Sequence, residues 1–486
     1  MLAISRFRSS FRILAAASFS ADASADFSGP EVKTRIPGPE SLRLISELNK
    51  IQESRAVDIF IDFKKSRGNY VYDADGNRLL DVCNHIASLP LGYNHPDILS
   101  ALQDPGILHL LAHRPALGIA PPTEFVHMLE SSLLAVAPAG LTDVMTMMCG
   151  ACAVENAFKT AFLHYQRRER GETEPTDEEY QSCLRNEPPG SPNLTVLTFK
   201  GSFHGRTFGA LSATRSKYLH KLDLPAFDWP AAPFPQLKYP LDEHEQENRR
   251  EEMSCLDAVR NIAREWSERG KPVACLSVEP IQSEGGDRHA TPYFFRELQT
   301  IAKDIGALFH VDEVQTFGIT GKLWAHEHWD LPHSPDIVTF AKKLQTSGAF
   351  VRPGLRPDRS WRIFNTWMGD PSKMIIADAV VKCIKKHDLV QKTGTVGAGL
   401  LKGLNELQER YPAILSRARG AGTLCSIDCR TSQLKDEVVK ALQNEGIYII
   451  GCGERTIRLR PSLVFEDRHA AVFLDIFDAV LARQPK

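Results

Sequence analysis

A charged residue follows each of two short apolar runs in the sequence. Ala307 to Val311 is apolar enough to form a buried strand and ends at Asp312. Ile337 to Phe340 has the same character and is followed closely by Lys342 and Lys343. In a parallel sheet the carboxyl ends of neighbouring strands meet at one edge, where open α/β sheets bind ligands. The sequence therefore predicts an acid and an amine in one crevice.

An acid beside a lysine fits the needs of pyridoxal phosphate. This cofactor forms a Schiff base with a lysine, and it needs an acid that keeps its pyridine nitrogen protonated. Asp312 supplies the acid, but spacing alone does not choose between Lys342 and Lys343. The alternative is that Asp312 caps the following turn and the lysines begin a solvated helix.

A candidate phosphate site lies earlier in the chain. Cys149-Gly150-Ala151-Cys152 stands between a predicted strand, Val144 to Met148, and a predicted helix. A phosphate is bound by backbone N–H groups at a helix start, and glycine lets the backbone approach it closely. Many strand-to-helix turns hold glycine for steric reasons alone. This turn therefore indicates a phosphate site only if it shares a sheet edge with Asp312 and Lys342.

Two more loops follow predicted strands and bring further chemistry to the same edge. In the loop after Leu194 to Phe199, Phe203 could stack on a pyridine ring and Arg206 could clamp a substrate carboxylate. In the loop after the next strand, Glu279 and Glu284 add two acids, and Glu284 is well placed to pair with an arginine. The plainer interpretation is a glycine-bounded loop with an ordinary exposed arginine.

Composition narrows the class of protein. The 486-residue chain is 43% hydrophobic and 24% charged, which is usual for a globular enzyme with more than one compact unit. A net charge of -2 gives no reason to expect nucleic acid or an anionic membrane as a partner. No apolar run approaches the ~20 residues that span a bilayer. The ten cysteines lack the spacing of a disulfide framework.

The first 28 residues differ from the rest of the chain. Arg6, Arg8 and Arg12 stand among serines and apolar residues, and no acid occurs before Asp22. This composition predicts a mitochondrial presequence over residues 1–28, and therefore a protein of the mitochondrial matrix. A disordered tail is the alternative.

The remaining chain predicts two domains of different size. Between residues 101 and 370, predicted strands alternate with helices, as in a mostly parallel sheet with helices on both faces. A long helix begins at Asp370-Pro371, and a smaller α+β unit follows. We expect a large domain at 101–370 and a small α+β domain built from 29–100 and 371–486.

Two kinds of local signal are also clear. Gly68 to Asn77 predicts a β-hairpin, with Asp75-Gly76 as its turn. The segments 167–192 and 227–252 are rich in proline and charge, and we expect them to be irregular surface excursions.

Several strings of residues resemble the class III aminotransferases, pyridoxal phosphate enzymes of fold-type I. Within that family the sequence is very similar to the mitochondrial 4-aminobutyrate (GABA) aminotransferases of animal type, and the match runs from about Thr34 to the C-terminus. The resemblance implies a mostly parallel central sheet in a large domain and a smaller α+β domain. The strings that carry it, in order, are Phe203 to Thr207, Val278 to Asp287, Val311 to Thr316, Trp324 to Trp329, Phe364 to Lys373 and Ile457 to Pro461.

The resemblance assigns roles around the cofactor. Lys342 matches the Schiff-base lysine that also shuttles the substrate proton, and Asp312 matches the partner of the pyridine nitrogen. Phe203 matches the ring that stacks on the cofactor, and Gln315 matches the neighbour of its phenolic oxygen. Thr366 matches a residue that reaches the phosphate from the other subunit, which implies a homodimer. The other cofactor-binding positions that it implies are Gly150, Ala151 and Glu279.

The resemblance also implies the substrates. Arg206 matches the arginine that holds the carboxylate of GABA, and Arg458 matches the one that holds the α-carboxylate of 2-oxoglutarate or glutamate. Glu284 matches the acid that neutralises the second arginine, and Ile86 matches an apolar wall of the pocket. The implied reaction is ping-pong: GABA gives succinic semialdehyde, and 2-oxoglutarate then gives glutamate.

Cys149 and Cys152 match a pair that, in the animal enzymes, joins its symmetry mate to hold a [2Fe-2S] cluster. One CxxC supplies only half of the four thiolates, so a two-fold axis must supply the rest. Buried free thiols are the alternative, and zinc is disfavoured because the chain has no second CxxC.

The sequence departs from the family pattern at several positions. Ala151 stands where serine is usual, Val154 and Cys83 replace polar and aromatic residues, and the loop after Gln315 is one residue short. Two rival functions follow: an ω-aminotransferase that prefers β-alanine or another ω-amino acid, and a non-catalytic dimeric scaffold. A dinucleotide-dependent oxidoreductase is disfavoured because no Gly-x-Gly-x-x-Gly follows a predicted strand.

Overall fold

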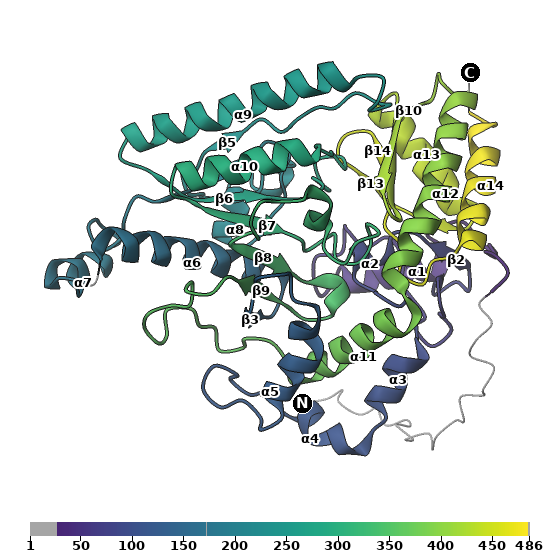
Figure 1. The fold of residues 1–486 in the computed structure, drawn as a ribbon. Coiled ribbons are helices and arrows are strands. Elements are labelled where there is room, and N and C mark those ends of the chain that lie inside the picture. The colour runs from purple at the N-terminus through teal and green to yellow at the C-terminus, as the bar shows by residue number, and fades with distance from the viewer. Residues whose placement is uncertain (1–26, 172, 485–486) are drawn as a thin grey trace.

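The computed structural model describes residues 27–171 and 173–484 (Figure 1). The expected presequence at 1–28 lies outside the described residues apart from its last two positions. Within the described ranges, no helix is both long enough and apolar enough to cross a bilayer.

The larger sheet is mostly parallel, as predicted. Its strand order is β3-β9-β8-β7-β6-β4-β5, and only β9 runs antiparallel to its neighbours β3 and β8. The carboxyl ends of β4, β6, β7 and β8 therefore meet at one edge. The strands are β3 (Asp143–Met147), β4 (Thr195–Phe199), β5 (Ala231–Ala232), β6 (Val273–Val278), β7 (Leu308–Asp312), β8 (Ile337–Phe340) and β9 (Ser347–Val351).

Helices cover both faces of this sheet (Figure 1). Helix α6 (Gly150–Arg170) packs on one face, and α9 (Glu245–Glu268) and α10 (Pro292–Asp304) pack on the other. Successive side chains of a strand point to opposite faces. In β6, Cys275 therefore packs in the cluster of Phe158 from α6, while Leu276 packs in the cluster of Phe294 from α10. Burial on both faces explains why these strands read as continuous apolar runs.

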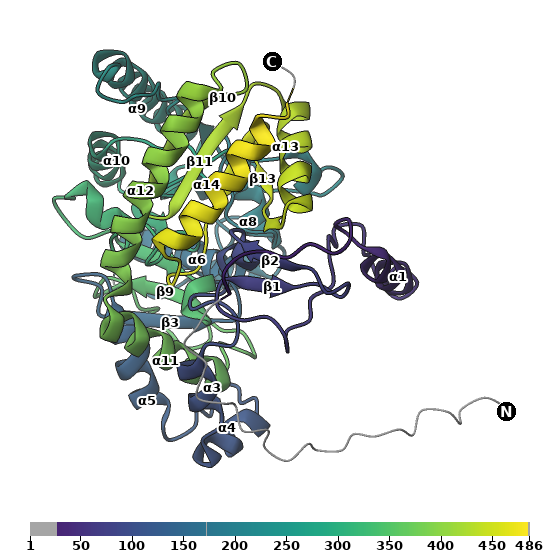
Figure 2. The ribbon, with the colours of Figure 1, turned by 90° about the vertical axis from the view of Figure 1, so that its right-hand side faces the viewer.

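Two smaller sheets complete the fold, and one of them joins strands from the two ends of the chain (Figure 2). The C-terminal strand β12 pairs in parallel with β2, which is also the antiparallel partner of β1. The second sheet is antiparallel, with the order β10-β11-β14-β13. These strands are β1 (Tyr70–Tyr72), β2 (Arg78–Asp81), β10 (Leu415–Ala421), β11 (Leu424–Cys429), β12 (Ile447–Tyr448), β13 (Gly451–Cys452) and β14 (Thr456–Leu459).

The long helix predicted after Asp370 is present. The Asp370 carboxylate accepts a hydrogen bond from Ser372 N–H and caps α11 (Pro371–His387). Helices α12 (Leu389–Arg410), α13 (Ser432–Asn444) and α14 (Asp467–Leu481) follow, and Gly446, just after α13, has φ +92°. The other helices are α1 (Pro39–Leu48), α2 (Asn84–Ala87), α3 (Pro96–Leu102), α4 (Leu108–Ala112), α5 (Phe125–Met128), α7 (Asp177–Cys183) and α8 (Phe208–Ala213).

The expectation of irregular structure at 167–192 and 227–252 was wrong in part. Helix α7 lies in the first segment, where Thr176 and Glu179 form a reciprocal capping box. Helix α9 begins in the second segment and buries a stripe that includes Cys255, Leu256 and Val259. Most charged residues of α9 lie on its exposed face, although Glu252 is buried and accepts hydrogen bonds from Thr291. This abundance of charge concealed the amphipathic pattern of the helix.

Candidate active site

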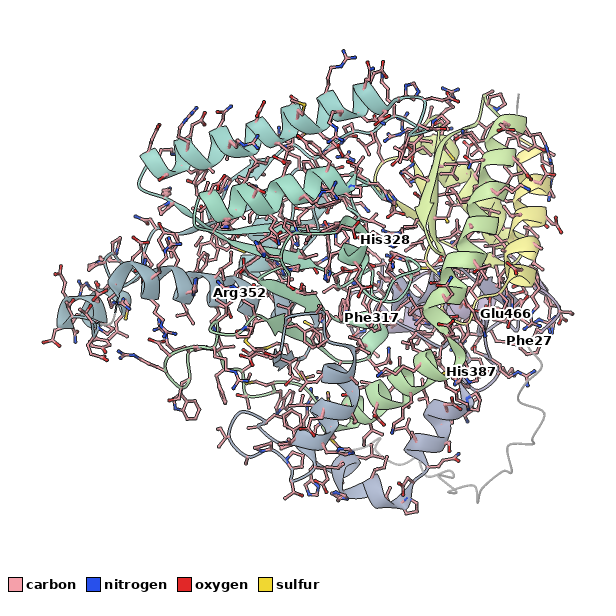
Figure 3. The ribbon with its side chains drawn as sticks, in the orientation of Figure 1. Phe27, Phe317, His328, Arg352, His387 and Glu466 are labelled. Atoms are coloured by element: carbon pink, nitrogen blue, oxygen red, sulfur yellow. The ribbon has the colours of Figure 1, made fainter. Side chains whose placement is uncertain are left out.

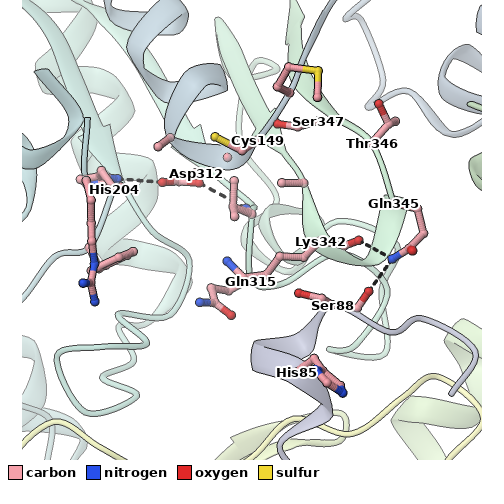
Figure 4. A pocket seen from close by; sticks show the side chains of 18 of the residues that line it. His85, Ser88, Cys149, His204, Asp312, Gln315, Lys342, Gln345, Thr346 and Ser347 are labelled. Atoms are coloured by element: carbon pink, nitrogen blue, oxygen red, sulfur yellow. Dashed lines mark hydrogen bonds and ion pairs between the residues drawn. The ribbon is translucent and has the colours of Figure 1, made fainter. Parts of the chain in front are cut away.

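A cavity of about 640 Å³ opens at the carboxyl-end edge of the larger sheet, beside the start of α6 (Figure 4). Residues from the strand ends, from α6 and from the turn before Leu89 form its wall. The sequence-predicted residues among them are Cys149, Gly150, Ala151, Phe203, Arg206, Glu279, Asp312, Gln315 and Lys342. Residues up to 193 positions apart in the sequence therefore lie around one cavity, as predicted, because the carboxyl ends of parallel strands meet at one edge of the sheet.

Asp312 is held as a charged acid at the base of this cavity. His204 Nδ1 donates to its Oδ2 at 2.8 Å, and Thr339 Oγ1 donates to its Oδ1 at 3.0 Å. Burial alone would raise the pKa of Asp312, but the hydrogen bond and charge of His204 lower it below the usual value. A carboxylate has about four acceptor positions, so Asp312 retains capacity for a ligand proton.

Lys342, and not Lys343, lines the cavity. Lys342 begins a short 3₁₀ turn directly after β8 and has a left-handed backbone, with φ +51°. The Lys343 ammonium lies elsewhere and donates to the Ala87 carbonyl at 3.3 Å. Burial and the positive charge of Arg460 lower the pKa of Lys342 to about 8, which makes its neutral, nucleophilic form accessible near neutral pH.

The start of α6 forms an anion cradle. The first helical hydrogen bond is donated by Ala153 to the Cys149 carbonyl, so the N–H groups of Gly150 and Ala151 stand before the helical ladder and suit an anion. A Cβ on Gly150 would lie 3.0 Å from Val314, and a Cβ on Gly205 would lie 2.7 Å from the Ala151 Cβ. Glycine at both positions therefore keeps the cradle open.

These groups fit pyridoxal phosphate. The cofactor carries an aldehyde for an amine, a pyridine nitrogen for a carboxylate, and a phosphate for backbone N–H groups. Lys342, Asp312 and the α6 start offer one of each around a single cavity. Ala151 lacks the usual serine hydroxyl, but its N–H group remains. Val154, the other departure in this turn, is fully buried beside Phe158 and suits its apolar setting.

Phe203 and Glu279 are tied together at the wall. The Phe203 N–H donates to Glu279 Oε2 at 2.8 Å, which fixes the loop that carries Arg206. Burial raises the pKa of Glu279 to about 8, so this acid is largely protonated near neutral pH. The Arg206 guanidinium carbon lies 5.8 Å from the Phe203 ring centre, and the side chain is exposed to the cavity mouth.

The predicted pair of Glu284 and Arg458 exists. Arg458 Nη2 donates to Glu284 Oε1 at 2.8 Å, and its Nη1 lies 3.3 Å from Asp287 Oδ1. Burial would raise the pKa of Glu284, but Arg458 lowers it to about 2. Lys217 also contacts Glu284 at 3.2 Å. Neither Glu284 nor Arg458 forms part of the cavity wall in this structure. The buried Arg458 guanidinium is paired with Glu284 and Asp287 behind the wall.

Other predicted residues lie outside the wall as well. Ile86 is 50% exposed and lies in a left-handed turn, Asn84 to Ala87, next to the wall residues His85 and Ser88. Thr366 is exposed and does not reach the cavity of its own chain. The sulfurs of Cys149 and Cys152 lie 3.4 Å apart, with Cys149 exposed.

Sequence reasoning missed part of the site. His204 lies within the string Phe203 to Thr207 without a predicted role, yet its side chain is fully buried and orients Asp312. Gln345, Thr346 and Ser347 line the wall where β9 begins. The signal for β9 was weak because Ser347–Val351 holds glycine and serine and follows β8 after a very short turn.

The comparisons with known proteins agree with this geometry. The family model described as "Aminotransferase class-III" matches residues 51–481. The mitochondrial 4-aminobutyrate aminotransferase of Homo sapiens is 48% identical over 97% of this chain and 94% of its own length. The 4-aminobutyrate aminotransferase of Dictyostelium discoideum is 49% identical over 95% of this chain and 92% of its own.

A solved structure agrees in fold. The lysine aminotransferase of M. tuberculosis superposes with a TM-score of 0.81 at 28% identity, covering 91% of this chain and 99% of that one. Together with the family match and the cavity that joins Lys342 to Asp312, this leads to one conclusion. The chain belongs to the class III aminotransferases, the pyridoxal phosphate-dependent enzymes of fold-type I.

Proposed function

We propose that this enzyme transfers the amino group of 4-aminobutyrate to 2-oxoglutarate, giving succinic semialdehyde and glutamate. The observation that carries the proposal is a pair of guanidinium groups: Arg206 lies at the mouth of the cofactor cavity, and Arg458, behind its wall, is close enough to lower the pKa of Lys342 and is neutralised by Glu284. Relatives about 48% identical over nearly the whole chain are named for this reaction.

Residues of the chain supply the proton chemistry. When bound, pyridoxal phosphate supplies an electron sink for the pair of electrons released from the substrate carbon. The Lys342 amine would take the proton from the carbon that bears the amino group and deliver it to the cofactor, and it would carry a proton in the opposite direction when 2-oxoglutarate is converted to glutamate. Asp312 keeps a proton on the pyridine nitrogen, and His204 holds the Asp312 carboxylate in place. Phe203 packs on the ring, Gln315 and Glu279 border it, and Gly150 and Ala151 bind the phosphate.

Two arginines allow one site to accept two different acids. GABA has a single carboxylate, which Arg206 binds. 2-Oxoglutarate and glutamate have a second carboxylate, which Arg458 binds once Glu284 has moved aside. While GABA is bound, Glu284 prevents an unpaired buried guanidinium, which would be costly. Ile86 forms an apolar side of the substrate path.

The active unit in this proposal is a homodimer in the mitochondrial matrix. Thr366 is exposed on its own chain and binds the phosphate held by the partner subunit. Several mammalian relatives carry the word mitochondrial in their names, and the basic, serine-rich start of the sequence agrees with import. We assign 29–100 and 371–486 to the small domain and 101–370 to the large one.

Cys149 and Cys152 are the proposed ligands of a [2Fe-2S] cluster shared with the partner subunit. The two sulfurs are 3.4 Å apart and open to the surface, so a second copy could add the other two thiolates. Iron and acid-labile sulfide analysis of the anaerobically purified protein tests this: two irons per dimer are expected, and iron-free protein would contradict it.

The test of the function is an absorbance titration of the purified holoenzyme. We expect GABA to remove the band of the Lys342-bound cofactor and 2-oxoglutarate to restore it, with succinic semialdehyde and glutamate formed in equal amounts. A band that responds to β-alanine but not to GABA would favour the ω-aminotransferase alternative. No cofactor band after addition of pyridoxal phosphate would favour the scaffold alternative.

A further inference from the structure

A second group of chemistry-bearing side chains lies away from the active site. His95 and Asp97 stand at the start of α3, and Cys383 comes from the last turns of α11. One ligand atom from each lies within 4.8 Å of the other two. His95 and Cys383 also line a separate cavity of about 370 Å³, which shares no wall residue with the active-site cavity.

The geometry within this group is that of a partly formed metal site. His95 Nε2 lies 3.9 Å from Cys383 Sγ, which is close to the separation of two ligands on one metal ion. His95 Nδ1 lies 3.3 Å from the Asp97 backbone nitrogen and caps α3. Asp97 is partly exposed and Cys383 is fully buried, so an ion could enter from the Asp97 side.

We propose that His95, Asp97 and Cys383 bind a zinc ion that joins α3 to α11. An imidazole, a carboxylate and a thiolate together select zinc over magnesium or calcium, which prefer oxygen alone. Cys383 and Asp97 as anions balance the double charge of the ion. The fourth position is open to water. His387, at the end of α11 (Figure 3), lines the same cavity one helical turn after Cys383.

Binding must compete with protons and with nearby cations. Burial lowers the pKa of His95, so its ring is neutral at pH 7, while burial and Asp97 raise the pKa of Cys383 to about 12. The charged groups that face these two residues are Asp97, Lys386, His387 and Lys392. A metal ion bound by His95 Nε2 and Cys383 Sγ therefore releases the one thiol proton to solvent and moves the ring proton to Nδ1, which then no longer accepts a hydrogen bond from the Asp97 N–H.

The position of the site suggests what the ion does. Helix α3 belongs to the N-terminal part of the chain. Helix α11 leads into α12, which the strands of the C-terminal sheets follow. Helices α3 and α11 already pack on each other, so a shared ion would hold together two segments 288 residues apart in the chain. The ion in this proposal is structural, and it stabilises the fold without taking part in the transfer reaction.

Cobalt(II) provides the test because its visible spectrum reports thiolate and imidazole ligands. Holoenzyme carrying Cys149→Ser and Cys152→Ser, which removes the other thiol pair, is stripped with chelator and titrated with cobalt. We expect one ion per chain, with tetrahedral ligand-field bands and a higher Tm. Cys383→Ala should abolish the bands, whereas Cys425→Ala, at another buried cysteine, should keep them.

A second pair of variants tests the proposal independently in case Cys383→Ala does not fold. His95→Asn removes the imidazole but keeps a residue that caps a helix well, and Asp97→Asn removes only the charge. Each should weaken zinc binding at least about tenfold, while the one proton released per bound ion, which comes from the Cys383 thiol, should be kept in both. Unchanged binding in both variants, or no stoichiometric binding by the folded parent protein, would overturn the proposal.

Discussion

At the residue scale, Lys342 and Asp312 are prepared for opposite charge states by their surroundings. Burial and Arg460 lower the pKa of Lys342 to about 8, which favours its neutral amine. His204 overcomes the burial of Asp312 and keeps it ionised. A nucleophile needs a free electron pair, and the partner of a pyridinium needs a negative charge, so both shifts serve the same reaction.

Replacing each lysine in turn distinguishes the role of Lys342 from that of Lys343. Lys342→Ala should lower kcat roughly 10⁴-fold or more and abolish the band of lysine-bound cofactor, because the amine is both nucleophile and proton carrier. The control is Lys343→Ala, which removes an amine bonded to Ala87 and should keep the band. Steady-state kinetics and absorbance spectra of both variants check this. A normal spectrum in Lys342→Ala would contradict the assignment.

Glu284 should make stability depend on pH. Its pKa falls from 4.5 to about 2 in the folded chain, so its stabilising effect is complete above pH 4.5 and is lost as the pH falls toward 2. Glu284→Gln should therefore lower stability at pH 7 by at most about 3 kcal/mol, and this deficit should shrink below pH 4.5.

Urea unfolding of both proteins between pH 7 and pH 3 measures that deficit. Glu187→Gln, at an exposed acid paired with Arg185, is the control and should change the urea midpoint little at any pH. A deficit for Glu284→Gln that stays constant across this range would show that the Arg458 pair does not lower the pKa of Glu284.

At the element scale, the start of α6 and the loop after β4 must approach each other for the anion cradle to form. Gly205 has φ +127°, and an added Cβ would lie 2.7 Å from the Ala151 Cβ and 2.9 Å from its Cα. The helix start cannot yield easily because α6 packs along the sheet. The loop therefore needs glycine here for both its conformation and its space.

Gly205→Ala should destabilise the protein by about 1–3 kcal/mol and weaken pyridoxal phosphate binding, because the helix start must shift. Gly76→Ala is a matched control: this residue has φ +81° in the hairpin turn, and an added Cβ would have no neighbour within 4 Å. It should lower the Tm modestly and leave cofactor affinity unchanged. Thermal unfolding and equilibrium dialysis measure both effects. Equal cofactor affinity in the two variants would refute this account of the cradle.

At the scale of the whole molecule, the proposed dimer makes each active site from two chains. Heterodimers of a Lys342→Ala subunit and a Thr366→Ala subunit contain one site with both native residues and one with neither. We expect about half of the wild-type activity in such a heterodimer, purified through two different tags. If Thr366 acted within its own chain, the heterodimer would show only half of the activity of the Thr366→Ala homodimer.

Much of the fold and site could be predicted from local patterns. Strands buried on both faces read as apolar runs, and the residues just after them, Asp312, Lys342, Phe203 and Glu279, follow directly from the strand ends. The hairpin turn and the cap at Asp370 were also visible, because glycine, aspartate and proline have strong local preferences. Strand β9 and helix α7 were not, because β9 begins with serine and glycine after a very short turn and α7 has few apolar residues.

By itself, the sequence determined most strands of the larger sheet, the chemical groups at their ends, and the family. Only the tertiary structure showed which lysine faces the cavity. Lys342, with its left-handed backbone, lines the cavity, whereas the Lys343 side chain reaches the Ala87 carbonyl. The tertiary structure also placed His204 behind Asp312, and it brought His95 to Cys383 across 288 residues. These contacts depend on packing between distant segments, and no local pattern of residues encodes such a distance.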